Sequence, residues 1–460
     1  MGENMNKNIY IVYELKNREY DSVLLLKSEL EGRGYRVEII NKQMMFRWKY
    51  KKAVVVIPNC YTTANYDYYR YLLNSKHNYI INLQLEQVIS KKSEENGYFN
   101  PKGKAAEVVH LCWGENSYNR LLTNNIDKHN LYITGATQLD FLRPEFKELW
   151  YSRDEIIKKY SLPKGKIWIL YISSFAYVNN ELVVKHLQKD LGGESKAQYI
   201  KQFEQISIES QKITLELLEK LVKNNKDIAV IYRNHPAEKT NKRITKLAEK
   251  YNNSFFNISE LNIKQWLMVS DQVVTWFSTS IVECYMAKKM CYVVRPIPIP
   301  KDIDATIYNN CNSFINNYDE LEFVIRGSKR NDYDTRFPID IEDINSYYEV
   351  DSIPAYIKVA NVIETYSNKE IRKSSYLYNL RRNIYILKHG IILKYYIKRI
   401  YSSLYERFGV RIKNSNLRNR FAFENLEIEI RNKEYYLKDE NYKLDIIGKV
   451  LKLINLKLVK

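Results

Sequence analysis

The stretch that most constrains the fold runs from Asp227 to Pro296, where two short apolar runs each end in a small polar cluster. The run IAVIY leads into RNHP, and the run QVVTWF leads into STS and then into a helical pattern. A buried strand that hands over to a helix through polar residues is typical of open α/β sheets, whose ligands lie at the carboxyl ends of the strands. We therefore expect both clusters to project into one crevice from successive strand ends. The clusters consist of Arg233, Asn234, His235, Pro236, Ser278, Thr279 and Ser280.

The second cluster has the chemistry of an anion site. Ser278, Thr279 and Ser280 fall where the next helix begins, so their hydroxyls and the N–H groups of the first turn form a nest for phosphate. His235 and Arg233 can add a donor or a positive charge from the neighbouring strand end. Together these residues suit the phosphate leaving group of a nucleotide.

Each cluster also has a purely structural interpretation. The spacing of Ser280 and Glu283 is that of an ordinary helix capping box. A histidine before a proline, as in His235 and Pro236, is commonly part of a structural turn. Only the pairing of the two clusters at strand ends favours a functional role.

Strand and helix patterns alternate along most of the chain, which predicts parallel strands covered by helices. A second strand series begins at 166–175 and includes a long helical pattern over 198–224. The expected fold class is α/β, with two doubly wound Rossmann-like domains facing a cleft and a mainly helical, basic C-terminal extension. The expected domains are 1–160, 161–366 and 367–460. In the first of them we expect strands at 8–14, 36–40, 53–59 and 78–87.

Composition excludes several other classes of protein. The 460 residues include no uninterrupted apolar run of about 18, so no spanning helix is expected. The N-terminus lacks a signal-peptide core, which predicts a cytoplasmic location. The five cysteines have no metal-binding spacing. Asp302 and Asp304 match DxD but lie in a proline-rich loop, where carboxylates are usually solvated, so no metal site is predicted.

The tail carries most of the positive charge. The segment 371–420 holds 13 Lys or Arg and one acidic residue, Glu406. Between 376 and 408 apolar residues recur at three- and four-residue intervals, which predicts a basic amphipathic helix of the kind that binds anionic membrane surfaces. The same apolar stripe could instead pack onto the body of the protein or form a dimer interface. No role is assigned to 421–460.

Several short motifs then occur in an order that resembles a known family. These motifs are EL-x-x-RE-x-D, LEQ, WGENS and ITGATQLDFLRPEF, followed by RNHP and STS-x-x-E. They resemble the bacterial surface carbohydrate biosynthesis proteins, a glycosyltransferase-like group of the two-domain B architecture, and more loosely the capsule and teichoic-acid transferases with an HP motif and a serine motif. The resemblance covers about 8–366 and leaves the tail outside.

The resemblance implies a division of labour between the domains. The second domain would bind the nucleotide donor, with the serine cluster on its phosphate, His235 beside it and Glu283 on a ribose or sugar hydroxyl. The first domain would hold the acceptor and supply a carboxylate base. Glu86, at the end of the expected fourth strand, is slightly preferred over Glu14, at the end of the first.

Two further residues belong to the expected acceptor side. Glu115 is a third candidate base, but it also suits a plain position at a helix N-terminus. Arg18 could bind an anionic acceptor or be an ordinary surface charge. For every candidate carboxylate, a solvated or capping role is an equal alternative.

The predicted function is a metal-independent glycosyltransferase that moves a sugar from a nucleotide-activated donor to a capsular or surface polysaccharide or a lipid-linked acceptor. Its nucleotide-sugar is a co-substrate, and no cofactor is expected. One alternative is a CDP-alcohol-dependent glycerol- or ribitol-phosphate transferase of the teichoic-acid type. Another is a non-catalytic basic scaffold that binds membrane or polymer. No nucleic-acid-binding motif accompanies the charge. A cytoplasmic enzyme at the inner face of the membrane fits these expectations.

Overall fold

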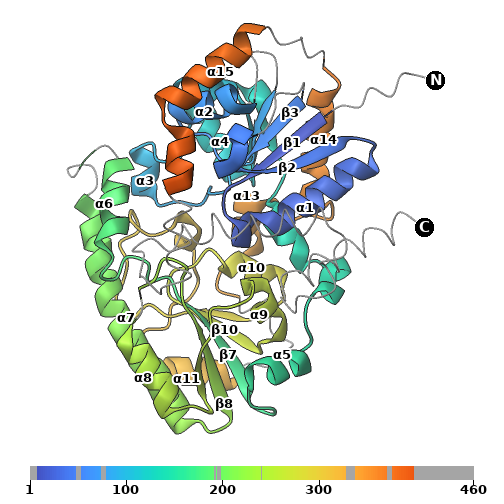
Figure 1. Ribbon diagram of the computed structural model, residues 1–460. Coiled ribbons are helices and arrows are strands. Elements are labelled where there is room, and N and C mark those ends of the chain that lie inside the picture. The colour runs from blue at the N-terminus through green and yellow to red at the C-terminus, as the bar shows by residue number, and fades with distance from the viewer. Residues whose placement is uncertain are drawn as a thin grey trace. The chain divides into compact units, whose positions relative to one another are not determined.

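The chain forms two compact units, which are described separately (Figure 1). Unit 1 comprises 1–87, 99–140 and 346–460, and unit 2 comprises 88–98 and 141–345. The computed structural model describes residues 8–47, 53–73, 79–190, 193, 198–239, 241–327, 337–369 and 376–397. Most of the predicted C-terminal extension, including all of 421–460, therefore lies outside the described residues.

Unit 1 contains a six-stranded parallel sheet in the order β2-β1-β3-β4-β5-β6. Its longer strands are continuous apolar runs, such as IYIVY and AVVVI, because both faces of a parallel sheet are buried. The fourth strand is much shorter than the sequence predicts and ends at Asn82. The strands are β1 (Asn8–Tyr13), β2 (Arg36–Asn41), β3 (Ala53–Ile57), β4 (Ile80–Asn82), β5 (Val109–Cys112) and β6 (Leu131–Ile133).

Helices cover both faces of this sheet. Alternate residues of β1 enter different cores: Ile9 and Ile11 pack in the core cluster that includes residues of α1 and α14, whereas Tyr10 and Val12 pack in the cluster that includes residues of α2 and α15. This two-sided burial is the doubly wound arrangement. The helices of unit 1 are α1 (Lys16–Gly32), α2 (Thr63–Leu73), α4 (Glu115–Thr123), α14 (Ala355–Ser367) and α15 (Tyr376–Lys388).

Unit 2 contains a five-stranded parallel sheet in the order β11-β10-β7-β8-β9. The long α7 (Gln198–Asn224) has the predicted bounds and packs against β8. The strands are β7 (Ile167–Ile172), β8 (Ile228–Arg233), β9 (Phe255–Asn257), β10 (Gln272–Thr275) and β11 (Cys291–Val293). The remaining helices are α3 (Lys91–Glu95), α5 (Arg153–Tyr160), α6 (Glu181–Asp190), α8 (Lys242–Lys250), α9 (Ile263–Val269), α10 (Ile281–Met286) and α11 (Tyr318–Gly327), with α13 (Ile341–Tyr348) spanning the boundary between the units.

The strand order of each sheet reverses at one point. In unit 1 the reversal falls between β1 and β3, and in unit 2 it falls between β7 and β10. Ligands of open α/β sheets bind outside the carboxyl ends of the strands at this reversal. The predicted α/β class with two doubly wound Rossmann-like units is confirmed, and each unit has a defined place where a ligand is expected. No helix among the described residues has the length and apolar character needed to cross a membrane.

Residues 346–366 pack with unit 1, although they fall in the expected second domain 161–366. The contacts come from the WGENS and ITGATQLD motifs. Gly114 approaches the backbone so closely that an added Cβ would lie 2.5 Å from the Ser346 carbonyl oxygen. Asp140 accepts hydrogen bonds from the backbone N–H groups of Ala355 and Tyr356 and so caps α14. The two motifs therefore anchor a returning segment, which strand and helix periodicity alone does not reveal.

Candidate functional site

The two polar clusters lie at the carboxyl edge of the unit 2 sheet, because β8 and β10 are both parallel to β7. They are not on successive strand ends as expected, since β7 lies between β8 and β10. The residues after β7, Ser173 and Ser174, therefore occupy the centre of this edge. The hydroxyl of Ser174 is buried and has no hydrogen-bond partner among the described residues. A buried hydroxyl without a protein partner calls for an explanation, such as a bound water or a ligand.

The turn after β8 is built around Glu238. One carboxylate oxygen of Glu238 accepts from the backbone N–H of His235 at 3.0 Å, and the other accepts from the hydroxyl of Tyr232 at 3.0 Å. The same tyrosine oxygen lies within hydrogen-bond distance, 3.1 Å, of the Ser173 hydroxyl at the end of β7. Burial raises the pKa of Glu238, and hydrogen bonds from its neighbours oppose that shift. The HP turn is thus fixed in position relative to the centre of the sheet edge.

His235 presents an N–H donor. Its Nδ1 accepts from the backbone N–H of Ala237 at 3.1 Å, which assigns the proton of the neutral ring to Nε2. The residue has an exposed surface, but the protein atoms packed around it desolvate the imidazole and lower its pKa to about 4. The ring is therefore neutral at pH 7 and can donate through Nε2 without carrying a charge.

Arg233 and Glu283 connect the two clusters electrostatically. The guanidinium of Arg233 donates to the carbonyl oxygens of Glu260 and Leu261. Burial lowers the pKa of Arg233 to about 10, and the carboxylates of Glu260 and Glu283 oppose that shift, so the group stays cationic at pH 7. Glu283 itself forms a largely buried ion pair with Lys264 of α9 at 3.2 Å.

Asn234 has a structural partner rather than an open side chain. Its amide nitrogen donates to the side chains of Asn257, at 2.7 Å, and Ser259, at 3.1 Å. Asn257 is the last residue of β9, so this contact ties the end of β8 to the next strand end. Asn234 therefore shapes the edge on which His235 lies.

In the serine loop after β10, some of the backbone N–H groups expected to bind an anion are already hydrogen-bonded within the protein. The backbone N–H of Ser278 donates to the hydroxyl of Tyr308, and that of Ser280 donates to the hydroxyl of Ser278. Ser280 is the N-cap of α10, yet its side chain makes no capping hydrogen bond. The capping-box interpretation is therefore wrong for this serine. Within the described chain, neither the Thr279 N–H nor the hydroxyl hydrogen of Ser280 has a protein acceptor, so both can serve a ligand.

A buried ion pair contacts the serine loop through Tyr308. Arg295 pairs with Asp304 at 3.0 Å, and both side chains are less than a tenth exposed. The guanidinium also lies over the ring of Tyr308, whose hydroxyl donates to the Ser278 carbonyl oxygen at 2.6 Å. Asp304 is thus not a solvated loop carboxylate as predicted, because it accepts hydrogen bonds from the Arg295 guanidinium and from the backbone N–H of Ala305.

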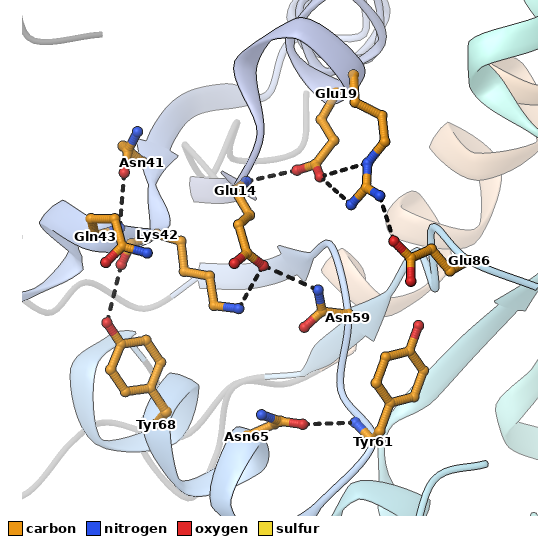
Figure 2. A network of polar contacts seen from close by, with 11 residues as sticks. Glu14, Glu19, Asn41, Lys42, Gln43, Asn59, Tyr61, Asn65, Tyr68 and Glu86 are labelled. Carbon is orange, nitrogen blue, oxygen red and sulfur yellow. Dashed lines mark hydrogen bonds and ion pairs between the residues drawn. The ribbon is translucent and has the colours of Figure 1, made fainter. Parts of the chain in front are cut away.

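In unit 1, Glu14 follows β1 at the reversal of strand order, and polar contacts link it to its neighbours (Figure 2). Its carboxylate pairs with Lys42, just after β2, at 2.8 Å and accepts from Asn59, just after β3, at 3.3 Å. The backbone N–H of Glu14 donates to Glu19 of α1. Three strand ends and one helix therefore converge on this residue, whose carboxylate side chain is only 12% exposed.

Glu86 lies in a loop rather than at a strand end. It is 47% exposed and pairs with Arg18 at 2.5 Å, and Arg18 also pairs with Glu19 (Figure 2). Arg18 is thus neither an isolated surface charge nor an open anion site. A small, mainly apolar pocket adjoins this pair, lined by Val12, Arg18, Glu19, Ser22, Val23, Leu26, Leu83, Leu85, Thr137 and Gln138.

Glu115 is the first residue of α4 and is exposed. Gly114 provides the N-cap, so the carboxylate lies where it stabilises the helix dipole. This is the plain helix-terminal position that the sequence allows for Glu115.

Several residues of these networks escape sequence reasoning. Lys42 and Asn59 directly follow strands, which is the signal that could have identified them, as it identified Glu14. The three-residue spacing between His235 and Glu238 is a similar local signal. Arg295 also closely follows a strand, β11, whereas Lys264 lies in α9 and only packing brings it to Glu283.

Comparisons with known proteins find structural similarity alone. No family model and no curated protein matches the sequence. The S. aureus MnaA–UDP co-structure shares 13% identity at a TM-score of 0.47, over 80% of this chain and 99% of that chain. A putative UDP-N-acetylglucosamine 2-epimerase from Listeria monocytogenes shares 12% identity at a TM-score of 0.46, over 80% and 99%. The wall teichoic acid polymerase TagF shares 11% identity at a TM-score of 0.46, over 80% and 91%.

Proposed function

We propose that unit 2 binds the phosphate of a nucleotide-activated sugar at the carboxyl edge of β7, β8 and β10. The observation that carries this proposal is the convergence of unpaired hydrogen-bond donors on the point of strand reversal. Ser174, Thr279 and Ser280 offer hydroxyl or N–H groups there, and His235 offers its Nε2–H. Phosphate oxygens are suitable acceptors for such a set.

The local charge supports the same ligand. Arg233 is a cation at this edge, and its guanidinium is held by the carbonyl oxygens of Glu260 and Leu261. A leaving phosphate would be stabilised by this charge and by preorganised donors. The proposed leaving-group activation uses only protein groups, so we expect nucleotide binding to persist in EDTA.

For the acceptor we propose Glu14 as the carboxylate base, in preference to Glu86. Glu14 lies at the strand reversal of unit 1, where Lys42 and Asn59 fix its orientation. Glu86 lies in a loop and is paired with Arg18. The base would accept the proton of an acceptor hydroxyl as that oxygen attacks the anomeric carbon and the nucleotide departs. The proposed acceptor is a surface polysaccharide or a lipid-linked saccharide.

A phosphate site of this kind would equally serve a CDP-alcohol, from which a glycerol- or ribitol-phosphate unit is transferred. Mass spectrometry of the modified acceptor separates the two, because a hexose and a polyol phosphate add different masses. A non-catalytic scaffold would modify no acceptor.

Thermal unfolding with CMP, CDP, UDP and GDP tests the proposed donor site. We expect at least one nucleotide to raise Tm, since a ligand at 100 times its Kd stabilises the folded state by about 2.7 kcal/mol. The rise should be lost in His235→Ala and in Ser174→Ala. Ser313→Ala, an exposed serine of unit 2 outside the proposed site, serves as a matched control and should keep it. A Tm that no nucleotide shifts would favour the scaffold instead.

A further inference from the structure

Helix α15 and the helical residues 391–397 that follow it have one face that unit 1 already uses. Ile386, Ile391 and Tyr395 are buried in unit 1, and the Tyr385 ring stacks on Tyr71 of α2 with centroids 4.6 Å apart. Arg382 donates to the Phe46 carbonyl oxygen at 2.6 Å. Figure 1 shows α15 beside α2. Of the predicted apolar stripe, Ile391 and Tyr395 therefore pack against the rest of unit 1, whereas Leu380, Ile384 and Leu387 are exposed.

The other face is exposed and apolar. Of the 12 large hydrophobic side chains that are exposed among the described residues, seven lie between 380 and 397. Leu387 is 77% exposed, and such clustering of large side chains marks an interaction surface rather than the scattered exposure common on monomers. We define the apolar face as Leu380, Ile384, Leu387, Ile392, Leu393 and Ile397.

The charges within the segment that carries the apolar face are of one sign. Arg381, Lys388 and Lys394 are exposed on the same two helical pieces. No Asp or Glu occurs anywhere between residues 371 and 405 of the sequence. An apolar helical face whose own segment carries only cations has the chemistry that an anionic lipid interface recognises.

A second copy of the chain fits this surface poorly. A two-fold dimer would set the same patch against itself, so each cation would meet the cations of its twin without a carboxylate between them. The helical pieces are also too short to span a bilayer, since 13 residues of α15 rise about 20 Å. Lying in the plane of the interface is the arrangement that buries the apolar face and keeps the cations at the headgroups.

We propose that the apolar face of 380–397 docks unit 1 on an anionic membrane surface. The helix would lie parallel to the bilayer, with its packed face held by α2 and its exposed face among the headgroups and upper acyl chains. This proposal concerns where the protein binds and does not depend on the reaction that it performs.

Co-sedimentation of the full-length protein with vesicles tests the proposal without any assay of activity. We expect binding to vesicles of phosphatidylglycerol and phosphatidylcholine, weaker binding to phosphatidylcholine alone, and a decline as NaCl is raised. Leu387→Glu should weaken binding at least about tenfold, because it places a charge on the apolar face. Phe323→Glu, on α11 of unit 2, is the matched control, since Phe323 is also 77% exposed. Ile384→Glu serves as a second variant.

Three results would overturn the proposal. They are no binding of the unaltered protein to anionic vesicles, equal binding by Leu387→Glu and Phe323→Glu, and a dimer in light scattering that Leu387→Glu converts to monomer. Circular dichroism spectra that match the unaltered protein would confirm that both variants are folded. If the unaltered protein bound anionic vesicles but transferred no sugar, that result would count against the proposed enzyme and not against the membrane proposal.

Discussion

At the scale of single residues, the candidate carboxylates of unit 1 differ in how firmly they are held. Glu14 has cationic and amide partners on neighbouring strand ends, whereas Glu86 has one arginine in a loop and Glu115 has a helix N-terminus. A base must be oriented towards the proton that it removes. These surroundings make the three positions separable by substitution.

We expect Glu14→Gln to lower kcat about 100-fold or more, since a positioned general base contributes that much, and to leave the Kd for nucleotide unchanged. Glu86→Gln should change kcat no more than about threefold. Release of the nucleotide product provides the measurement, with Glu115→Gln as the exposed control in the same unit. If Glu86→Gln produced the larger loss, Glu86 would be the base.

Sequence patterns predict that residues of this kind lie at strand ends, but they do not predict which side chains contact them. His235, Ser278 and Glu14 are recognised because each closely follows an apolar strand, and the structure does place each at a strand edge. Their partners lie further along the chain: Lys42 reaches Glu14 and Tyr308 reaches Ser278 only after the sheets have formed. Tertiary packing determines such contacts, so local sequence carries no record of them.

At the scale of elements, the loop after β4 is fixed by a chain of buried hydrogen bonds. The backbone N–H of Gln84 donates to the side-chain oxygen of Asn82, whose amide nitrogen contacts Nδ1 of His110 at 3.0 Å. The other ring nitrogen of His110 contacts the Ala105 carbonyl oxygen. Gln84 has φ +48°, a strained value for a residue other than glycine. The turn that ends β4 early is therefore a tertiary feature, which explains why apolar pattern alone overestimates this strand.

Burial lowers the pKa of His110 to about 4, below its ordinary value of 6.5. The unfolded chain therefore binds a proton near pH 6.5 that the folded protein does not bind until about pH 4. We expect the free energy of unfolding of unit 1 to fall by roughly 3 kcal/mol as the pH drops through this window. Urea denaturation at several pH values measures it, and His110→Gln should flatten the dependence. An equally steep decline in His110→Gln would show that other groups are responsible.

At the scale of the whole molecule, the chain leaves unit 1, builds unit 2 and then returns. Val359, Ala360 and Ile363 of α14 are buried in the core cluster that includes residues of β1 and α1. Strand and helix alternation predicts both sheets, yet it assigns α14 to the wrong neighbours because an amphipathic helix does not specify which sheet it covers. The steric fit at Gly114 and the carboxylate of Asp140 supply that specificity.

We expect Gly114→Ala to destabilise unit 1 by about 1–3 kcal/mol, because the added methyl group would overlap backbone atoms of 346–348 that cannot rotate away. Its φ of −160° is extended, so the cost is one of space rather than of conformation. Limited proteolysis should show faster cleavage near 349–354 in this variant. Gly165→Ala, where nothing lies within 4 Å but φ is positive, is a control for strain without overlap. Unaltered cleavage in Gly114→Ala would argue against the steric anchor.

The passage from β9 to β10, residues 258–271, makes the order of strands reverse in unit 2. It also carries the carbonyl oxygens that hold Arg233 and the ammonium group that neutralises Glu283. One short connection thus sets both the route of the backbone and the electrostatics of the edge. A change in the length of this connection would disturb both features at once, unlike a change in an ordinary surface loop. Relatives with a different ligand should therefore differ in the residues of this connection before they differ in its length.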